Sequence, residues 1–197
     1  RSSDICGTCH DVSSPAWDRI GTADYAPNSW DLAHPTATSY DMLPIERTFS
    51  EWSNSDFAAG GVNLPQYGGV VSTCQDCHMS PVTGVGSNVD GSPLRTDLPL
   101  HDMTGGNTVV QDYIAGAYPD EVDLGQLQAS KDRARATLAK AARLELTTDA
   151  SGVTVRVYND TGHKLPSGYP EGRRIWLEVE AYDADSGDAV VFASGAY

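Results

Sequence analysis

The sequence predicts a mixed fold: a mostly irregular N-terminal region with short helices, one longer helix, and a small antiparallel β module. Three patterns along the chain carry this prediction. Residues 1–119 show little periodicity, residues 120–143 repeat apolar side chains at helical spacing, and residues 144–197 alternate apolar and polar side chains. We therefore expect three regions with these boundaries.

The N-terminal region, residues 1–119, is rich in glycine, proline, serine, asparagine and aspartate, with aromatic residues scattered through it. In an ordinary globular protein this composition indicates loops or disorder. Short helices are expected around residues 44–57, because Ile45, Phe49 and Trp52 recur at helical spacing.

The helix expected over residues 120–143 is the most regular element. Acidic residues gather at its start and basic residues in its later turns, which suits the helix dipole. We expect it to connect the other two regions or to pack against them. Its apolar face consists of Leu124, Leu127, Ala134, Leu138 and Ala141.

The C-terminal region, residues 144–197, contains four candidate strands. Residues 153–158 and 175–182 alternate apolar and polar side chains, and shorter runs at residues 144–146 and 189–192 flank them, with turn signals between. The pattern predicts a small antiparallel sheet, one part of an immunoglobulin-like sandwich. Because such a sandwich has about seven strands, this one is incomplete unless another chain or later residues supply the rest. Its exposed edges would invite pairing between molecules.

The chain is strongly acidic. Lysine and arginine total 13 against 27 aspartate and glutamate residues, for a formal net charge of -14. This charge argues against nucleic acid and anionic membrane surfaces as partners, although simple solubility explains it equally well. No apolar run is long enough to span a bilayer.

All four cysteines fall in two C-x-x-C-H motifs, CGTCH at residues 6–10 and CQDCH at residues 74–78. This is the attachment motif of c-type haem. The two thiols add to the vinyl groups of the porphyrin, and the adjacent histidine binds the iron. The sequence therefore predicts two covalently attached haems c. The attachment residues are Cys6, Cys9, Cys74 and Cys77, and the proximal ligands are His10 and His78.

Other uses of paired cysteines explain the pattern less well. A thioredoxin-like dithiol gives no reason for a histidine directly after the second cysteine, twice. A zinc ribbon separates its two cysteine pairs by about 15–20 residues, whereas Cys9 and Cys74 are far more distant. Disulfide bonds are chemically allowed, but they leave His10 and His78 unexplained.

Two haems would also change the expectation for residues 1–119. A porphyrin is a large, rigid, apolar body that can serve as a core, so this region can wrap the haems with few helices or strands. Short helices are expected at both motifs, because two cysteines one helical turn apart reach one edge of a macrocycle.

Two histidines outside the motifs are candidates for distal axial ligands on sequence context. His163 lies in a loop between two strands that prolines and glycines stiffen, and a rigid loop of this kind suits a ligand. His101 follows the second motif on an irregular segment with Asp102 beside it. Met103 is a thioether alternative to His101.

His34 is the third remaining histidine. It precedes Pro35, which holds it in extended geometry. Two six-coordinate haems need only two ligands beyond the motif histidines, so one of three would be surplus. We expect a surplus histidine to cap a haem in a neighbouring subunit or in a missing part of the chain; a surface histidine is the other interpretation.

Several segments resemble large multihaem c-type cytochromes of respiring and metal-reducing bacteria. The segments are ICGTCHDV, PIERTFSEW, TCQDCHM, LHDMTGGN and NDTGHKLPSGYPEGRRIWLEV, at residues 5–12, 44–52, 73–79, 100–107 and 159–179. The resemblance implies electron transfer outside the cytoplasm. It also implies haem ligation by His10 and His78, with distal roles for His101 and His163.

The same resemblance bears on assembly. Related proteins usually carry more haems, and some cytochromes of this general kind polymerise into extracellular conductive filaments. A histidine often precedes the PIERT segment in that family, and the corresponding residue here is Leu43. His34 is either the substitute for that ligand or unrelated to it.

The leading hypothesis is an electron carrier rather than an enzyme, with two bis-histidine haems. Two imidazole ligands leave no open position on the iron and favour a lower potential than histidine–methionine ligation. Its partners would be redox proteins or extracellular electron acceptors. Self-association into a filament or haem chain is the natural assembly.

Two alternatives stay open. A multihaem redox enzyme acting on a small nitrogen or sulfur compound would need an open iron position, which a surplus of histidines argues against. An electron-relay fragment of a longer cytochrome is the other, because both ends look cut or processed. Covalent haem attachment takes place outside the bacterial cytoplasm, so we expect an extracellular, cell-surface or periplasmic protein that has lost a leader.

Overall fold

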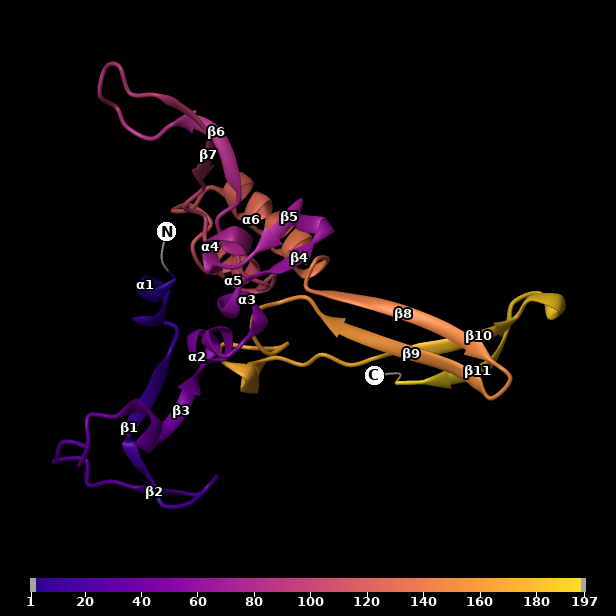
Figure 1. Cartoon of the computed structure of the whole chain (residues 1–197), viewed down its shortest axis with the longest axis horizontal. Coiled ribbons are helices and arrows are strands. Elements are labelled where there is room, and N and C mark those ends of the chain that lie inside the picture. The colour runs from indigo at the N-terminus through magenta and orange to yellow at the C-terminus, as the bar shows by residue number, and fades with distance from the viewer. Residues whose placement is uncertain (1–2, 196–197) are drawn as a thin grey trace.

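The computed structural model describes residues 3–195. Within that range the chain forms six α-helices and five small antiparallel sheets. Helices gather at the centre, and three arms extend from them, around residues 12–46, 81–99 and 142–194 (Figure 1). The mixed fold predicted from the sequence is confirmed at this level.

The first arm is a three-stranded sheet that follows α1 (Asp4–Gly7). The central strand β1 (Val12–Arg19) pairs antiparallel with β2 (Tyr25–Pro27) on one side and with β3 (Met42–Glu46) on the other. The register between β1 and β3 shifts across Pro15, because proline has no N–H to donate to a strand ladder.

The centre of the molecule is built from short elements. In chain order they are α2 (Thr48–Ser53), α3 (Asp56–Ala59), β4 (Val62–Leu64), β5 (Gly69–Val71) and α4 (Cys74–His78). The short helices expected around residues 44–57 are present as α2 and α3. The Asn54 side chain donates to the Ser50 carbonyl at 2.7 Å, and this competition with the backbone accompanies the end of α2.

A small hydrophobic cluster lies between these elements. It consists of Phe57, Leu64 and Val71, hereafter the Phe57 cluster, with Trp52 and Tyr67 packed against it. Across residues 3–195 only two further apolar residues are buried to the same degree, and both are alanines on or after the long helix. Many large apolar side chains are exposed instead, so the polypeptide alone buries little apolar surface.

The second arm is the hairpin of β6 (Pro81–Val85) and β7 (Leu94–Pro99), which projects away from the centre (Figure 1). The seven strands before residue 100 show that the N-terminal region is less irregular than expected. These strands are short and their registers slip, so the alternation that would predict them is interrupted.

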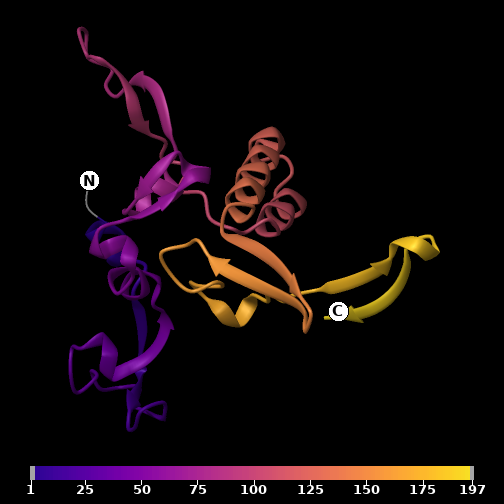
Figure 2. The same ribbon diagram turned by 45° about the vertical axis from the view of Figure 1, so that its right-hand side comes forward.

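Two helices follow and lie side by side, α5 (Val110–Ala117) and α6 (Leu124–Leu138) (Figure 2). An ion pair of 2.6 Å between Lys131 Nζ and Asp112 Oδ1 joins them. The long helix predicted over residues 120–143 is confirmed over the length of α6. It starts later because the Asp123 carboxylate caps it, and it ends earlier because a strand begins soon afterwards.

The third arm contains two separate hairpins rather than one sheet. One pairs β8 (Ala142–Asp149) with β9 (Gly152–Asn159), and the other pairs β10 (Val179–Asp183) with β11 (Ala189–Ser194). The single four-stranded sheet expected from the sequence is therefore wrong for the described residues. Residues 175–178 were expected to begin a strand, but they form an irregular segment before β10.

Four 3-10 turns complete the fold: η1 (Ser39–Asp41), η2 (Pro65–Tyr67), η3 (Pro170–Gly172) and η4 (Ala184–Ser186). The last of these forms the predicted turn between β10 and β11. Among the residues that the structure describes, no helix has the length and apolar character needed to cross a membrane.

Candidate haem-binding site

The two cysteine motifs lie against each other, although they are far apart in the sequence. The backbone N–H of Cys74 donates to the Ser3 hydroxyl, just ahead of α1, at 3.2 Å. Burial raises the pKa of the Cys6 thiol, and the hydrogen-bonded Cys74 thiol raises it further. The first cysteine of one motif is thus beside the first cysteine of the other.

The first motif is positioned by the start of α2. A Cβ on Gly7 would be 2.8 Å from Cγ of the Phe49 ring, so only glycine allows this ring to pack on α1. The Phe49 N–H donates to the His10 carbonyl oxygen at 2.8 Å. The glycine between the two cysteines therefore has a packing role, and α2 fixes the backbone of the motif histidine.

The second motif is a capped helical turn beside the Phe57 cluster. Thr73 and Asp76 form a capping box at the start of α4, and the Asp76 carboxylate accepts the Thr73 N–H at 2.8 Å. Cys77 packs against the Phe57 cluster. Burial raises the pKa of the Cys77 thiol, and the Tyr67 hydroxyl opposes this by donating to the sulfur.

The structure places His163 opposite His78. Their ring centres are 6.4 Å apart, and the ring planes differ by 23°. His78 Nδ1 is 2.6 Å from the Thr104 carbonyl oxygen, and His163 Nδ1 is 2.8 Å from the Lys164 carbonyl oxygen. Burial lowers the pKa of His163, which favours its neutral ring.

The loop that carries His163 is anchored on α2. The Glu51 carboxylate accepts the Lys164 N–H at 3.0 Å and the Ser167 hydroxyl at 2.8 Å. Close packing adds to this anchor, because a Cβ on Gly162 would be 2.9 Å from Trp52 Cδ1. The loop therefore reaches His78 through contacts with a helix more than a hundred residues earlier in the chain.

At the other end of the same loop, Asp160 is buried and forms an ion pair with Arg143 of β8, with 2.5 Å between Arg143 Nε and Asp160 Oδ2. Gln66 donates to the same carboxylate at 3.1 Å. Both ends of the loop are thus held by charged hydrogen bonds, which are stronger than neutral ones.

His10 has a carboxylate partner. Its Nδ1 is 2.7 Å from Glu46 Oε1, and the Thr48 hydroxyl donates to the same oxygen at 3.1 Å. The His10 side chain is 59% exposed. Within residues 3–195 no other histidine ring faces it as His163 faces His78.

In the described part of the chain, neither His34 nor His101 has a ring contact with His10 or His78. His34 Nδ1 is 2.8 Å from the Thr36 carbonyl oxygen. Its Nε2 is buried without a hydrogen bond, at 3.5 Å from Asp18 Oδ1. His101 is exposed, as is the alternative ligand Met103.

Four of the five histidines share one feature. Nδ1 lies within hydrogen-bond distance of an oxygen acceptor in His10, His34, His78 and His163. In metal sites this contact fixes the tautomer and leaves the lone pair of Nε2 for the metal. The donor set is therefore chemically suited to axial ligation.

The distance between His78 and His163 also suits one shared iron. Metal–nitrogen bonds of about 2.0–2.1 Å on both sides of a metal put the two ring centres about 6 Å apart, since each ring centre lies about 1 Å beyond its nitrogen. Among residues 3–195 no group of three or more histidine, cysteine or acidic side chains is arranged to hold a lone metal ion. In haem the other four nitrogens come from the macrocycle.

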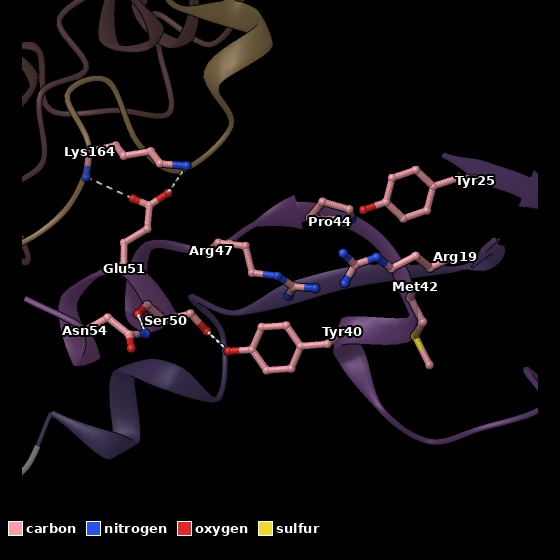
Figure 3. A pocket seen from close by; sticks show the side chains of 10 residues that line it. All are labelled: Arg19, Tyr25, Tyr40, Met42, Pro44, Arg47, Ser50, Glu51, Asn54 and Lys164. Carbon is pink, nitrogen blue, oxygen red and sulfur yellow. Dashed lines mark hydrogen bonds and ion pairs between the residues drawn. The ribbon is translucent and has the colours of Figure 1, made fainter. Parts of the chain in front are cut away.

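A pocket of about 330 Å³ opens beside these contacts, between β1, β3, α2 and the His163 loop (Figure 3). Arg19, Arg47 and Lys164 line it, and the two guanidinium groups point toward each other. Lys164 Nζ is 3.6 Å from a Glu51 oxygen, and Arg47 Nη1 is 3.5 Å from an Asp11 oxygen. In a chain of net charge -14, this pocket could hold a carboxylate or another anion.

Sequence reasoning missed Glu46, Thr48 and Glu51 as residues that position histidines. All three lie in the PIERTFSEW segment that was compared with multihaem cytochromes. That likeness marked the segment, but the roles of its side chains depend on partners far away in the chain. The contact of Thr104 with His78 uses a backbone carbonyl, so no side chain in the sequence indicates it.

Searches of protein-family models, curated proteins and solved structures found no match to this chain. Its function is therefore argued from the geometry above.

Proposed function

We propose that the chain is an electron-transfer protein of the multihaem c-type cytochrome class, with two covalently attached haems c. The observation that carries this proposal is the facing pair His78 and His163, with ring centres 6.4 Å apart. One haem would lie between these rings, and His10 would bind the iron of the other. The attachment residues would be Cys6 and Cys9 for one haem and Cys74 and Cys77 for the other.

The proposal accounts for the small core. Large apolar side chains such as Ile5, Trp30 and Tyr113 are exposed, and the Phe57 cluster is small for a chain of this length. Two porphyrins would give these side chains apolar surface to cover. Residues 1–119 would then wrap the haems, as the sequence predicts.

A bound haem supplies reversible one-electron reduction of its iron. The residues of the chain hold the imidazoles in place: the Thr104 and Lys164 carbonyls accept from Nδ1 of His78 and His163. Two imidazole ligands favour a lower potential than histidine–methionine ligation. The hydrogen bond from the Cys74 N–H to the Ser3 hydroxyl does not use the thiols, so it would still hold the two motifs together with both haems attached, which favours electron exchange between the haems.

The setting of the protein follows from the same chemistry. Covalent haem attachment implies a location outside the cytoplasm, in the periplasm or at the cell surface. Electrons would pass to redox proteins or to extracellular acceptors. The acidic surface suits cationic partners.

Self-association is part of the proposal. His10 lacks a facing histidine within residues 3–195, so a histidine of a second copy could bind that iron and extend a haem chain or filament. The two hairpins of the third arm would belong to an immunoglobulin-like sandwich that other strands complete, since an isolated hairpin is marginally stable in water.

The variant His34→Ala tests the source of that ligand, with His101→Ala as the matched comparison. If His34 of a second copy closes the His10 site, His34→Ala gives smaller particles in electron micrographs and one five-coordinate haem. His101→Ala then leaves assembly unchanged. A fully six-coordinate His34→Ala protein that still assembles would contradict the role of His34.

A redox enzyme is the second candidate, and one observation favours it. The absence of a facing histidine at His10 in the described residues would leave that iron open to a small ligand. Nitrite, hydroxylamine or carbon monoxide should then change the spectrum of the reduced protein at neutral pH. An unchanged spectrum would exclude this reading.

The proposed function itself is tested by intact mass and a pyridine haemochrome spectrum of the native protein. We expect two haems per chain, joined by thioether bonds, and no free thiol. Four cysteines that react with a thiol reagent, without a haem spectrum, would overturn the proposal.

A further inference from the structure

We infer that Glu46 holds the redox potential of the His10 site below that of the site formed by His78 and His163. The inference rests on the proposed function, because it concerns two haem sites, and it adds a difference between them. Both motifs supply the same ligand, a histidine, and the Asp76 carboxylate of the second motif is engaged by the backbone at the start of α4. The distinction comes from what each proximal histidine contacts through Nδ1.

The contacts at the two proximal histidines differ in charge. His10 Nδ1 lies 2.7 Å from a carboxylate oxygen of Glu46, whereas His78 Nδ1 lies 2.6 Å from the neutral carbonyl oxygen of Thr104. The distal candidate His163 also has a neutral carbonyl partner, at Lys164. The two distances are similar, so these two proximal contacts differ mainly in the charge of the acceptor.

The negative charge of Glu46 is not neutralised by a nearby cation. Across residues 3–195 its one ion pair is with His10, and no lysine or arginine pairs with it. The neighbouring Arg47 guanidinium is directed to Asp11, Ser13 and the Ser39 carbonyl instead. The His10 ring therefore faces an uncompensated carboxylate.

Backbone pairing places this carboxylate. Glu46 ends β3 and lies opposite Val12 of β1, two residues after His10. Its oxygen is held by the Thr48 hydroxyl at 3.1 Å, and Thr48 itself accepts the Gly168 N–H at 3.0 Å. The contact between Glu46 and His10 is therefore held in place by strand pairing and by the hydrogen bonds through Thr48 to the His163 loop.

A carboxylate acceptor increases the basicity of a ligating imidazole, because it draws the Nδ1 proton toward itself. A more basic ligand stabilises the ferric over the ferrous state and lowers the potential. One electron shared between the two sites would therefore reside at the His78 and His163 site. In that state the His10 site is oxidised and the other site is reduced.

The test is a spectroelectrochemical titration of the full chain with both haems attached, comparing wild type with Glu46→Gln and Glu46→Asp. We expect two one-electron components in the wild type. In Glu46→Gln the lower component rises toward the upper one, which stays in place. Glu46→Asp keeps the carboxylate and returns the lower component toward its wild-type potential.

Glu145→Gln is the control. Glu145 lies in β8 and accepts a hydrogen bond from the Tyr158 hydroxyl, and its replacement removes the same charge from the chain. β8 extends away from α1 and α4, which carry cysteines of the two motifs (Figure 1). Both components should keep their potentials. An equal shift in Glu145→Gln and Glu46→Gln would assign the effect to net charge and overturn the inference.

A second measurement distinguishes an effect of Glu46 on the redox potential from a purely structural role. The ferric electron paramagnetic resonance spectrum should change for one haem in Glu46→Gln, while both remain low-spin. Retained haems with unmoved components, or a rise in the upper component, would overturn this inference alone. A wild-type protein without covalent haem would overturn the proposed function as well, and the haemochrome spectrum identifies that case.

Discussion

Single residues engage Nδ1 of the three histidines that are proposed to bind haem iron. His78 and His163 use backbone carbonyls for this contact, and His10 uses the Glu46 carboxylate. A carbonyl contact depends on backbone position and survives most substitutions. A carboxylate contact can be removed by one mutation, so the chemical properties of the His10 site are the easier ones to change.

At this scale His163→Ala is the most direct test of the paired ligands. With the facing imidazole removed, one of the two haems should become five-coordinate and high-spin, and it should gain carbon monoxide binding when reduced. Absorption and electron paramagnetic resonance spectra measure both changes. Lys164→Ala is the matched control, because it keeps the carbonyl that contacts His163 Nδ1. Two low-spin haems in His163→Ala would contradict the pairing.

Among the elements, α2 links the two halves of the site. Phe49 packs on Gly7 of the first motif, Trp52 donates from Nε1 to the Ser72 carbonyl at 3.0 Å just before the second motif, and Glu51 anchors the His163 loop. These three side chains join one short helix to both motifs and to the His163 loop. The helix therefore sets the spacing between parts of the site that sequence separates widely.

The variant Glu51→Ala should show this linkage. It leaves the Lys164 N–H and the Ser167 hydroxyl without their acceptor, which we expect to cost about 1–3 kcal/mol in the free energy of unfolding. Denaturant titration of the protein with its haems attached measures the loss. Glu121→Ala, at an exposed position, should change the same quantity by less than about 0.5 kcal/mol. Equal losses in the two variants would show that the Glu51 hydrogen bonds to the His163 loop add no specific stability.

At the scale of the whole molecule, the chain has too little polypeptide core to fold firmly by itself. The Phe57 cluster is the main group of buried apolar side chains in the described residues, and three arms extend from the centre (Figure 1). Folded domains are stable by only about 5–15 kcal/mol. Under the proposed function, two porphyrins would supply apolar surface on the scale that such a margin requires.

We accordingly expect chain produced in a bacterial cytoplasm, where haem is not attached, to lack a cooperative unfolding transition. Calorimetry and near-ultraviolet circular dichroism would compare it with exported protein that carries both haems. The exported form should unfold with a sharp heat-absorption peak and show fixed aromatic signals. A haem-free chain with the same transition temperature as the exported protein would contradict a haem-dependent core.

Local patterns made part of the fold predictable. The apolar repeat of α6 and the alternation of β9 could be read directly, since each depends on neighbours a few residues away. The grouping of β8–β11 into two hairpins could not, because alternation identifies a strand but says nothing about which strand it pairs with. The slipped pairing of β1 and β3 interrupts the pattern altogether.

The same division holds for the site. The cysteine motifs and their histidines are contiguous in the chain, because haem attachment needs those groups within one helical turn, and they could be predicted without coordinates. The pairing of His163 with His78, and of Glu46 with His10, required the folded chain. Each pair joins segments brought together by packing at Gly162, by the Glu51 anchor or by strand pairing, and such long-range contacts leave no local mark in a single sequence.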